Sequence, residues 1–306
     1  MDPESAEWIR ALSGDGDERE AAVVRLHERL VAVARRETRR RHTSPAITGP
    51  ELDDLADQAA DDALLAVLAK LPTFRGESRF TTWAYRFVML EVSHRLGRHH
   101  WRHARPHDAH DWDRFPDRFG LDPHRHAEAA ELAAAVRDAV EARLTPHQRE
   151  VFVSAVVDGV PLDALAERMG VTRGAVYKAL FDARRNLREA LVEQGHLEAV
   201  PSRRRARKGV GVELDRFLRT DPADVGCEEA LRLLHVYADL VSADRRGAER
   251  RYPGIVAHLA ACGPCGDDYA GLLTAISGDP GGPGAPEGRP EARGRRFLRR
   301  RPRSGR

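Results

Sequence analysis

Hydrophobic residues recur at the three- and four-residue spacing of amphipathic helices along most of the chain. In the segment 18–41, for example, Ala22, Leu26 and Leu30 would form one apolar stripe along a single helix. No run of alternating apolar and polar residues is long enough to indicate a sheet. The pattern therefore predicts an all-α protein.

Segments rich in proline, glycine or polar residues divide the expected helices into three groups. The first group comprises expected helices over residues 2–12, 18–41, 51–71 and 79–101. The expected organisation is a first helical domain over 1–105, a linker over 106–122, a second helical domain over 123–195, a basic linker over 196–220, a small helical third domain over 221–277 and a disordered, arginine-rich tail over 278–306.

The segment 161–180 has the pattern of a helix-turn-helix motif. Gly170 allows a tight turn, and Thr172 is placed to cap the second helix. A recognition helix contacts bases from its N-terminal residues, so we expect its polar residues to be exposed and to contact DNA. The candidates are Thr172, Arg173, Gly174, Tyr177, Lys178 and Arg184. The alternative is a three-helix core with a solvated charged face.

A second basic segment combines arginines with aromatic residues, a composition that fits single-stranded DNA. Phe80, Trp83 and Phe87 would share one face of the helix over 79–101. For Trp83 and Phe87 we favour the alternative, that they belong to the hydrophobic core. The candidate DNA contacts in this segment are Arg75, Ser78, Arg79, Trp83, Arg86, Arg95 and Arg98.

The net charge of +2 conceals a strong segregation of charge along the chain. The stretch 51–62 contains six acidic residues and no basic one, whereas 79–105 contains six arginines and a single acid, Glu91. This arrangement predicts one face for nucleic acid and another for a partner protein.

The two helical domains together resemble regions 2 and 4 of the extracytoplasmic-function (ECF) sigma factors, a group of the sigma-70 family. The resemblance lies in residues 57–71 with 74–78, in residues 80–86, and in residues 144–151 with the helix-turn-helix. It implies a subunit that binds core RNA polymerase at the clamp and flap and confers promoter choice. The first domain would melt the −10 element and the second would read the −35 element of promoter DNA. The expected polar contacts with polymerase are Asp57, Asp61 and Asp62.

All three cysteines of the chain lie in the small third domain, close to one histidine. Cys227 precedes the run His258, Cys262 and Cys265, which has the spacing H-x3-C-x2-C. In a reducing compartment such a cluster is more often a zinc site than a disulfide, so we expect one zinc ion. His235 is an alternative fourth ligand, and three unrelated hydrophobic thiols are the simplest alternative.

This third domain resembles the zinc-binding anti-sigma fold. The resemblance implies a module that acts in cis on the sigma domains and responds to redox state or metal, although the zinc could instead only stabilise a small fold. The sequence leaves open whether a separate anti-sigma factor is also a partner.

Other classes of protein are less consistent with the sequence. It contains no membrane-spanning run and no signal peptide, which predicts a cytoplasmic protein. We expect no enzyme, because four protein ligands would fill a tetrahedral metal site. The main alternative is a freestanding helix-turn-helix regulator with a metal- or redox-sensing zinc domain.

Overall fold

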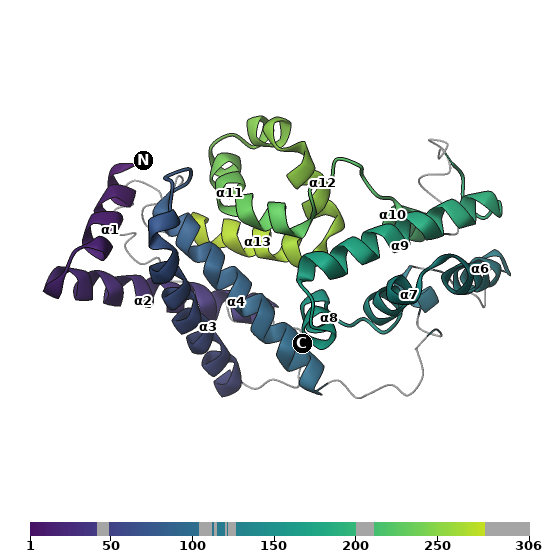
Figure 1. The fold of residues 1–306 in the computed structure, drawn as a ribbon, viewed down its shortest axis with the longest axis horizontal. Helices are drawn as coiled ribbons and strands as arrows, with labels where there is room; N and C mark the ends of the chain where they lie inside the picture. The colour runs from purple at the N-terminus through teal and green to yellow at the C-terminus, as the bar shows by residue number, and fades with distance from the viewer. Residues whose placement is uncertain are drawn as a thin grey trace, which may run out of the picture.

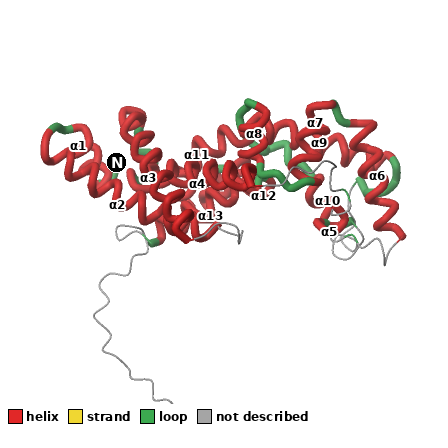
Figure 2. Tube along the Cα trace, turned by 90° about the horizontal axis from the view of Figure 1, so that it is seen from below, coloured by secondary structure: helices red, strands yellow, loops and turns green. Residues whose placement is uncertain are grey.

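The computed structural model describes residues 1–41, 49–103, 112, 115–119, 121, 127–199 and 211–278. Within these residues all regular structure is helical, which confirms the expected all-α class (Figure 2). The elements are α1 Pro3–Ser13, α2 Gly16–Arg41, α3 Gly49–Lys70, η1 Leu71–Thr73, α4 Phe80–His103, α5 Phe115–Arg118, α6 Ala127–Arg143, α7 Pro146–Phe152, η2 Val153–Val157, α8 Leu162–Met169, α9 Arg173–Glu193, α10 Val212–Leu218, α11 Gly226–Arg251, α12 Pro253–Ala261 and α13 Gly263–Ser277. None of these helices is long and apolar enough to cross a membrane. The expected disorder beyond residue 278 lies outside the described residues.

Helices α1–α4 form an N-terminal bundle around a continuous apolar core. The Asp2 side chain accepts a hydrogen bond from the backbone N–H of Ser5 at 2.9 Å and so caps α1 at its start. Trp83 and Phe87 are buried in this core, where their rings pack edge-on at 5.0 Å. The interpretation of these two aromatic residues as core is therefore confirmed.

Helices α6–α9 form a helix-turn-helix bundle. Thr145 and Gln148 form a reciprocal capping box at the start of α7. Gly170 ends α8 with a φ of 66°, a conformation that glycine adopts without steric cost, and Thr172 caps α9. These local signals produce the turn that the sequence predicted.

The two segments expected to be linkers contain residues that pack onto the helix-turn-helix bundle. Phe115 of α5 is fully buried in its core, and so are Leu214 and Leu218 of α10. Leu214 and Leu218 lie four residues apart on one helix face, a short apolar signal inside a segment read as basic linker. The linkers are thus partly folded against this bundle.

The C-terminal helices α11–α13 lie between α4 on one side and α9 on the other (Figure 1). Leu234 of α11 and Leu272 of α13 are buried in the core of the N-terminal bundle. Cys227, Cys262 and Cys265 belong instead to the apolar cluster of the helix-turn-helix bundle. A unit of this size buries little surface by itself, so contact with both neighbours completes its core.

Candidate metal centre and its surroundings

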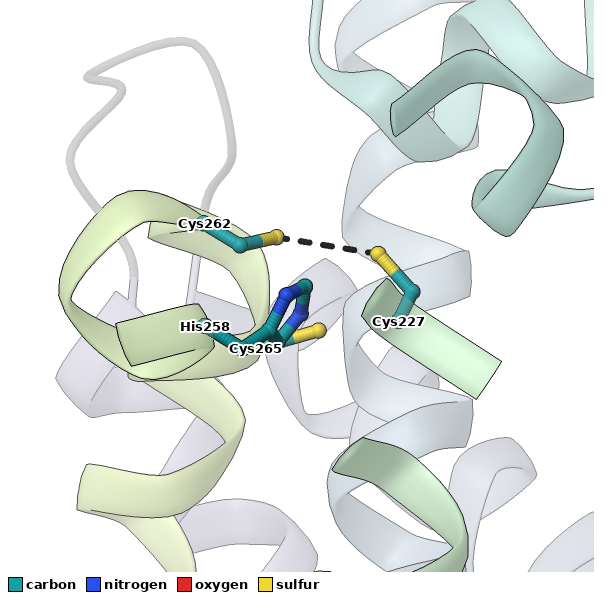
Figure 3. A group of neighbouring side chains, drawn as sticks. All are labelled: Cys227, His258, Cys262 and Cys265. Atoms are coloured by element: carbon teal, nitrogen blue, oxygen red, sulfur yellow. Dashed lines mark hydrogen bonds between the residues drawn. The ribbon is translucent and has the colours of Figure 1, made fainter. Parts of the chain in front are cut away.

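Four side chains from three helices and one junction converge at the contact between α9 and the C-terminal helices (Figure 3). Cys227 lies in the first turn of α11, His258 in α12, Cys262 between α12 and α13, and Cys265 in the first turn of α13. All four are buried, and their ligand atoms lie within 4.8 Å of one another. The four residues expected to bind metal are therefore brought together and could hold a metal ion.

The hydrogen bonds of His258 orient its ring for metal binding. Its Nδ1 lies 2.8 Å from Oδ1 of Asp224, while its Nε2 is buried and has no hydrogen-bond partner among the described residues. Burial lowers the pKa of His258, but the hydrogen bond with Asp224 outweighs burial and raises this pKa to about 11. A metal ion at Nε2 would satisfy the unpaired atom, because carboxylates commonly hold metal-binding histidines in this way.

His235, the alternative fourth ligand, lies elsewhere. Its Nδ1 is 3.1 Å from Nη1 of Arg86 in the N-terminal bundle. Burial and the charges of Arg86 and Arg232 lower the pKa of His235 to about 3, so the ring is neutral and Nδ1 can accept a hydrogen bond. The structure thus separates His235 from the cysteine cluster.

Arg173, the first residue of the recognition helix, points toward the C-terminal helices. Its Nη1 lies 3.1 Å from Oδ2 of Asp268 and 3.5 Å from Oδ1 of Asp163, and its Nη2 lies 3.4 Å from Sγ of Cys265. Only 11% of its side chain is exposed. The expectation that Arg173 is exposed is wrong, because α13 covers it.

Tyr177 and Arg184 are covered in the same way, with exposed fractions of 3% and 4%. The Tyr177 hydroxyl donates to Oδ2 of Asp224, and burial together with this bond raises the pKa of Tyr177. Arg184 donates to the carbonyl oxygens of Phe217 and Arg219, which lie at and just after the end of α10. Their expected exposure is also wrong, since α10, α11 and α12 pack over this face of α9.

The remaining residues of α9 and its cap that were predicted to contact DNA are less buried. Thr172 is exposed and accepts a hydrogen bond from the backbone N–H of Ala175, and Gly174 is half-buried. Lys178 is 69% exposed and pairs with Asp182 one turn later. A DNA-contacting role for these residues stays a prediction.

In the N-terminal bundle, two of the arginines predicted to contact DNA are bound by α11. Asp239 accepts hydrogen bonds from the backbone N–H of Arg79 at 2.6 Å and from Thr82 Oγ1 at 2.7 Å, and it pairs with the Arg79 guanidinium at 3.2 Å. Arg86 donates through Nη1 to the Arg232 carbonyl oxygen at 3.0 Å. α11 thus occupies the polar groups along the start of α4.

The other candidates on this surface have varied environments. Ser78 and Trp83 are buried, and Arg75 is exposed. Arg95 is held within the bundle by Gln58 and Asp62 of α3. The side chain of Arg98 lies outside the described residues.

The three aspartates predicted to contact polymerase lie along α3 and form ion pairs inside the N-terminal bundle. Asp57 pairs with Arg35 at 2.9 Å, Asp61 with His27 at 2.8 Å, and Asp62 with Arg95. Asp61 is exposed, and Asp57 and Asp62 are half-buried. Contact with polymerase through these carboxylates stays a prediction.

Residues 137–187 match the sequence family described as sigma-70, region 4. The similarity to the sigma-70 family lies in these residues, which belong to the helix-turn-helix bundle. A stretch of 143 residues is 29% identical to the ECF RNA polymerase sigma factor SigD of Mycobacterium bovis and of Mycobacterium tuberculosis. This match covers 46% of the chain and 65% of those relatives, so the chain spans just under two thirds of their length. No solved structure matches the chain significantly.

Asp268 of α13 joins region 4 to the N-terminal bundle, a role that the sequence analysis missed. This fully buried carboxylate pairs with Arg173 of region 4 at 3.1 Å and with Arg41 of α2 at 2.9 Å. Asp163 of region 4 also accepts a hydrogen bond from Ser93 of α4 at 3.2 Å. A single carboxylate from the C-terminal helices thus pairs with both bundles.

The sequence also did not indicate the roles of Asp224 and Asp239, because their partners are distant along the chain. Asp224 contacts Tyr177 and His258, which are 47 and 34 residues away along the chain, and Asp239 contacts Arg79, which is 160 residues away. The only local signal is that Asp224 lies three residues before Cys227. This position could have indicated a residue that hydrogen-bonds to a metal ligand.

Proposed function

We propose that the chain is an ECF-type sigma factor that binds core RNA polymerase and directs promoter-specific initiation in the cytoplasm. We further propose that its C-terminal helices inhibit it in cis and that it catalyses no reaction of its own. The observation that carries the proposal is that α11–α13 cover polar groups predicted to contact both promoter elements. Arg79 and Arg86 are bound in the proposed region 2, and Arg173 and Tyr177 are bound in region 4.

The closeness of the two sigma-type bundles also supports an inactive state. Promoter elements centred at −10 and −35 are separated by about 25 base pairs, or roughly 85 Å at 34–36 Å per helical turn. Here Asp163 of α8 bridges α4 and α9, because it contacts Ser93 at 3.2 Å and Arg173 at 3.5 Å. The bundles would therefore need to separate before they could contact both elements together.

We propose that the metal ion is zinc. The sulfurs of Cys227 and Cys262 lie 3.8 Å apart. This is close to the separation of about 3.8 Å that follows from two Zn–S bonds of about 2.3 Å at a tetrahedral angle. Cys227, His258, Cys262 and Cys265 would hold the ion and fill its four positions, which fits a structural site with no open position for catalysis. When bound, zinc would cross-link the start of α11 to α12 and α13.

The test is run-off transcription with purified core RNA polymerase on a library of candidate promoters. We compare the full chain with Asp239→Asn, which removes the charge facing Arg79 and Thr82 while keeping the size of the side chain. Each lost hydrogen bond to a charged group weakens the contact by about 1.5–3 kcal/mol, so we expect at least tenfold more transcript. Glu228→Gln, an exposed change on the same helix, is the matched control and should leave transcript unchanged.

Two results would contradict parts of this proposal. If neither form gives polymerase-dependent transcript but the chain binds DNA alone, the protein is a freestanding regulator. If both give the same specific transcript, the chain is a sigma factor but α11 does not inhibit it.

A further inference from the structure

Two residues of the recognition helix are also neighbours of the metal ligands. Tyr177 donates its hydroxyl hydrogen to Oδ2 of Asp224, and the other oxygen of Asp224 holds Nδ1 of His258 at 2.8 Å. The Tyr177 ring also packs edge-on against the His258 ring, with 4.7 Å between their centroids. A continuous chain of contacts thus runs from region 4 to a metal ligand.

Arg173 makes the corresponding contact on the opposite side of the cluster. Its guanidinium lies 3.4 Å from Sγ of Cys265, so it can donate to a thiolate there. Arg173 and Tyr177 are separated by one helical turn and therefore lie on the same face of α9. Among the described residues, region 4 supplies both of these polar neighbours through one face of one helix.

Groups that hydrogen-bond to metal ligands orient them and strengthen metal binding, and their loss typically weakens metal affinity by 10- to 100-fold. Arg173 and Tyr177 cannot contact DNA and these partners together, because Tyr177 is buried and only 11% of the Arg173 side chain is exposed. Binding of α9 to DNA through these residues must therefore break the contacts of Arg173 and Tyr177 with the metal centre.

We propose that Arg173 and Tyr177 are shared between the DNA-reading surface and the metal centre, so that metal retention and promoter binding by region 4 compete. This inference rests on the proposed function of region 4. Because binding linkage is reciprocal, bound metal weakens promoter binding by the same factor by which promoter binding weakens metal affinity. Arg173 and Tyr177 are positioning residues for the metal, since they act through Cys265, Asp224 and His258.

The experiment measures zinc release from the full chain to a chromophoric chelator, at constant pH and salt. Tyr177→Phe removes the hydroxyl but keeps the ring that packs on His258. We expect about tenfold faster release, with an unchanged far-ultraviolet circular dichroism spectrum. Arg185→Gln is the matched control, because Arg185 also lies on α9, is exposed, and pairs with Asp182. It should release zinc at the rate of the unchanged chain.

Arg173→Gln provides a second variant, with the same expected direction, should Tyr177→Phe fold poorly. Release within twofold of the unchanged chain for the folded variants would overturn the inference, as would a chain that binds no zinc. This readout is independent of transcription. Normal release from Tyr177→Phe together with activation by Asp239→Asn would remove the inference and leave the proposed function standing. Faster release without any transcription would leave Arg173 and Tyr177 as positioning residues for the metal but would remove promoter binding as the competing event.

Discussion

The beginnings of α11 and α13 face region 4, whereas later turns of the same helices face the N-terminal bundle. Cys227 and Cys265 lie in the first turns and pack into the region 4 cluster. Leu234, Asp239 and Leu272 lie further along and contact the N-terminal bundle. The two interfaces therefore use different chemistry on shared helices.

The region 4 interface contains the residues that would hold the metal, the N-terminal interface contains apolar packing and Asp239, and Asp268 pairs with both bundles. We therefore expect that different perturbations release the two bundles separately. Metal loss should first weaken the contact with region 4. Loss of the Asp239 carboxylate should first weaken the contact with the N-terminal bundle.

Metal removal is expected to have the largest effect and to distinguish the two interfaces most clearly. Structural zinc contributes about 10–16 kcal/mol in small zinc-dependent folds, so chelation should loosen α12, the start of α13 and the first turns of α9. Hydrogen exchange followed by mass spectrometry should show faster exchange there, while α1–α3 remain protected. Equal loss of protection in α3 and α9 would show that the interfaces are not separable.

Asp268→Asn should have the next largest effect, because this carboxylate bridges the two bundles. Removing one member of a buried ion pair costs about 3–5 kcal/mol, since the partner charge is left uncompensated, and here two arginines lose a partner. We expect a lower midpoint of chemical denaturation and a more extended chain by small-angle scattering. Asp267→Asn, the exposed neighbour, is the control. Similar midpoints for the two variants would show that Asp268 does not join the bundles.

The smallest expected effect is a dependence on pH at the N-terminal interface. Burial lowers the pKa of His235 to about 3 from an ordinary value of 6.5, so the folded form binds fewer protons than the unfolded form between these values. Stability therefore falls as pH falls below 6.5, by up to about 1.4 kcal/mol per pH unit. The charged groups facing His235 are Arg86 and Arg232, which do not titrate in this range.

His235→Gln keeps an acceptor for Arg86 but cannot titrate. Between pH 7 and pH 5.5 the unchanged chain should lose about 1 kcal/mol more stability than this variant. Equal losses, measured by chemical denaturation at both pH values, would exclude His235 as the source of the effect.

The sequence by itself determined most helices of the two bundles, because their signals are local, whereas α5 and α10 fell in segments expected to be linkers. The Asp2 and Thr145 caps, the glycine turn at Gly170 and the apolar periodicity each act over a few residues. The candidate metal ligands were predicted for a similar reason. His258, Cys262 and Cys265 lie close together in sequence, and these residue types have few other uses in such spacing.

Only the tertiary structure decided which face of each helix is open. Arg173, Tyr177 and Arg184 satisfy every local criterion for exposed residues of a recognition helix, yet helices from residues 211–278 cover them. Asp224, Asp239 and Asp268 are ordinary surface residues by sequence pattern and become partners of distant arginines and a tyrosine on folding. Charge pairing depends on distance in space, and hydrophobic periodicity carries no information about which charges will meet.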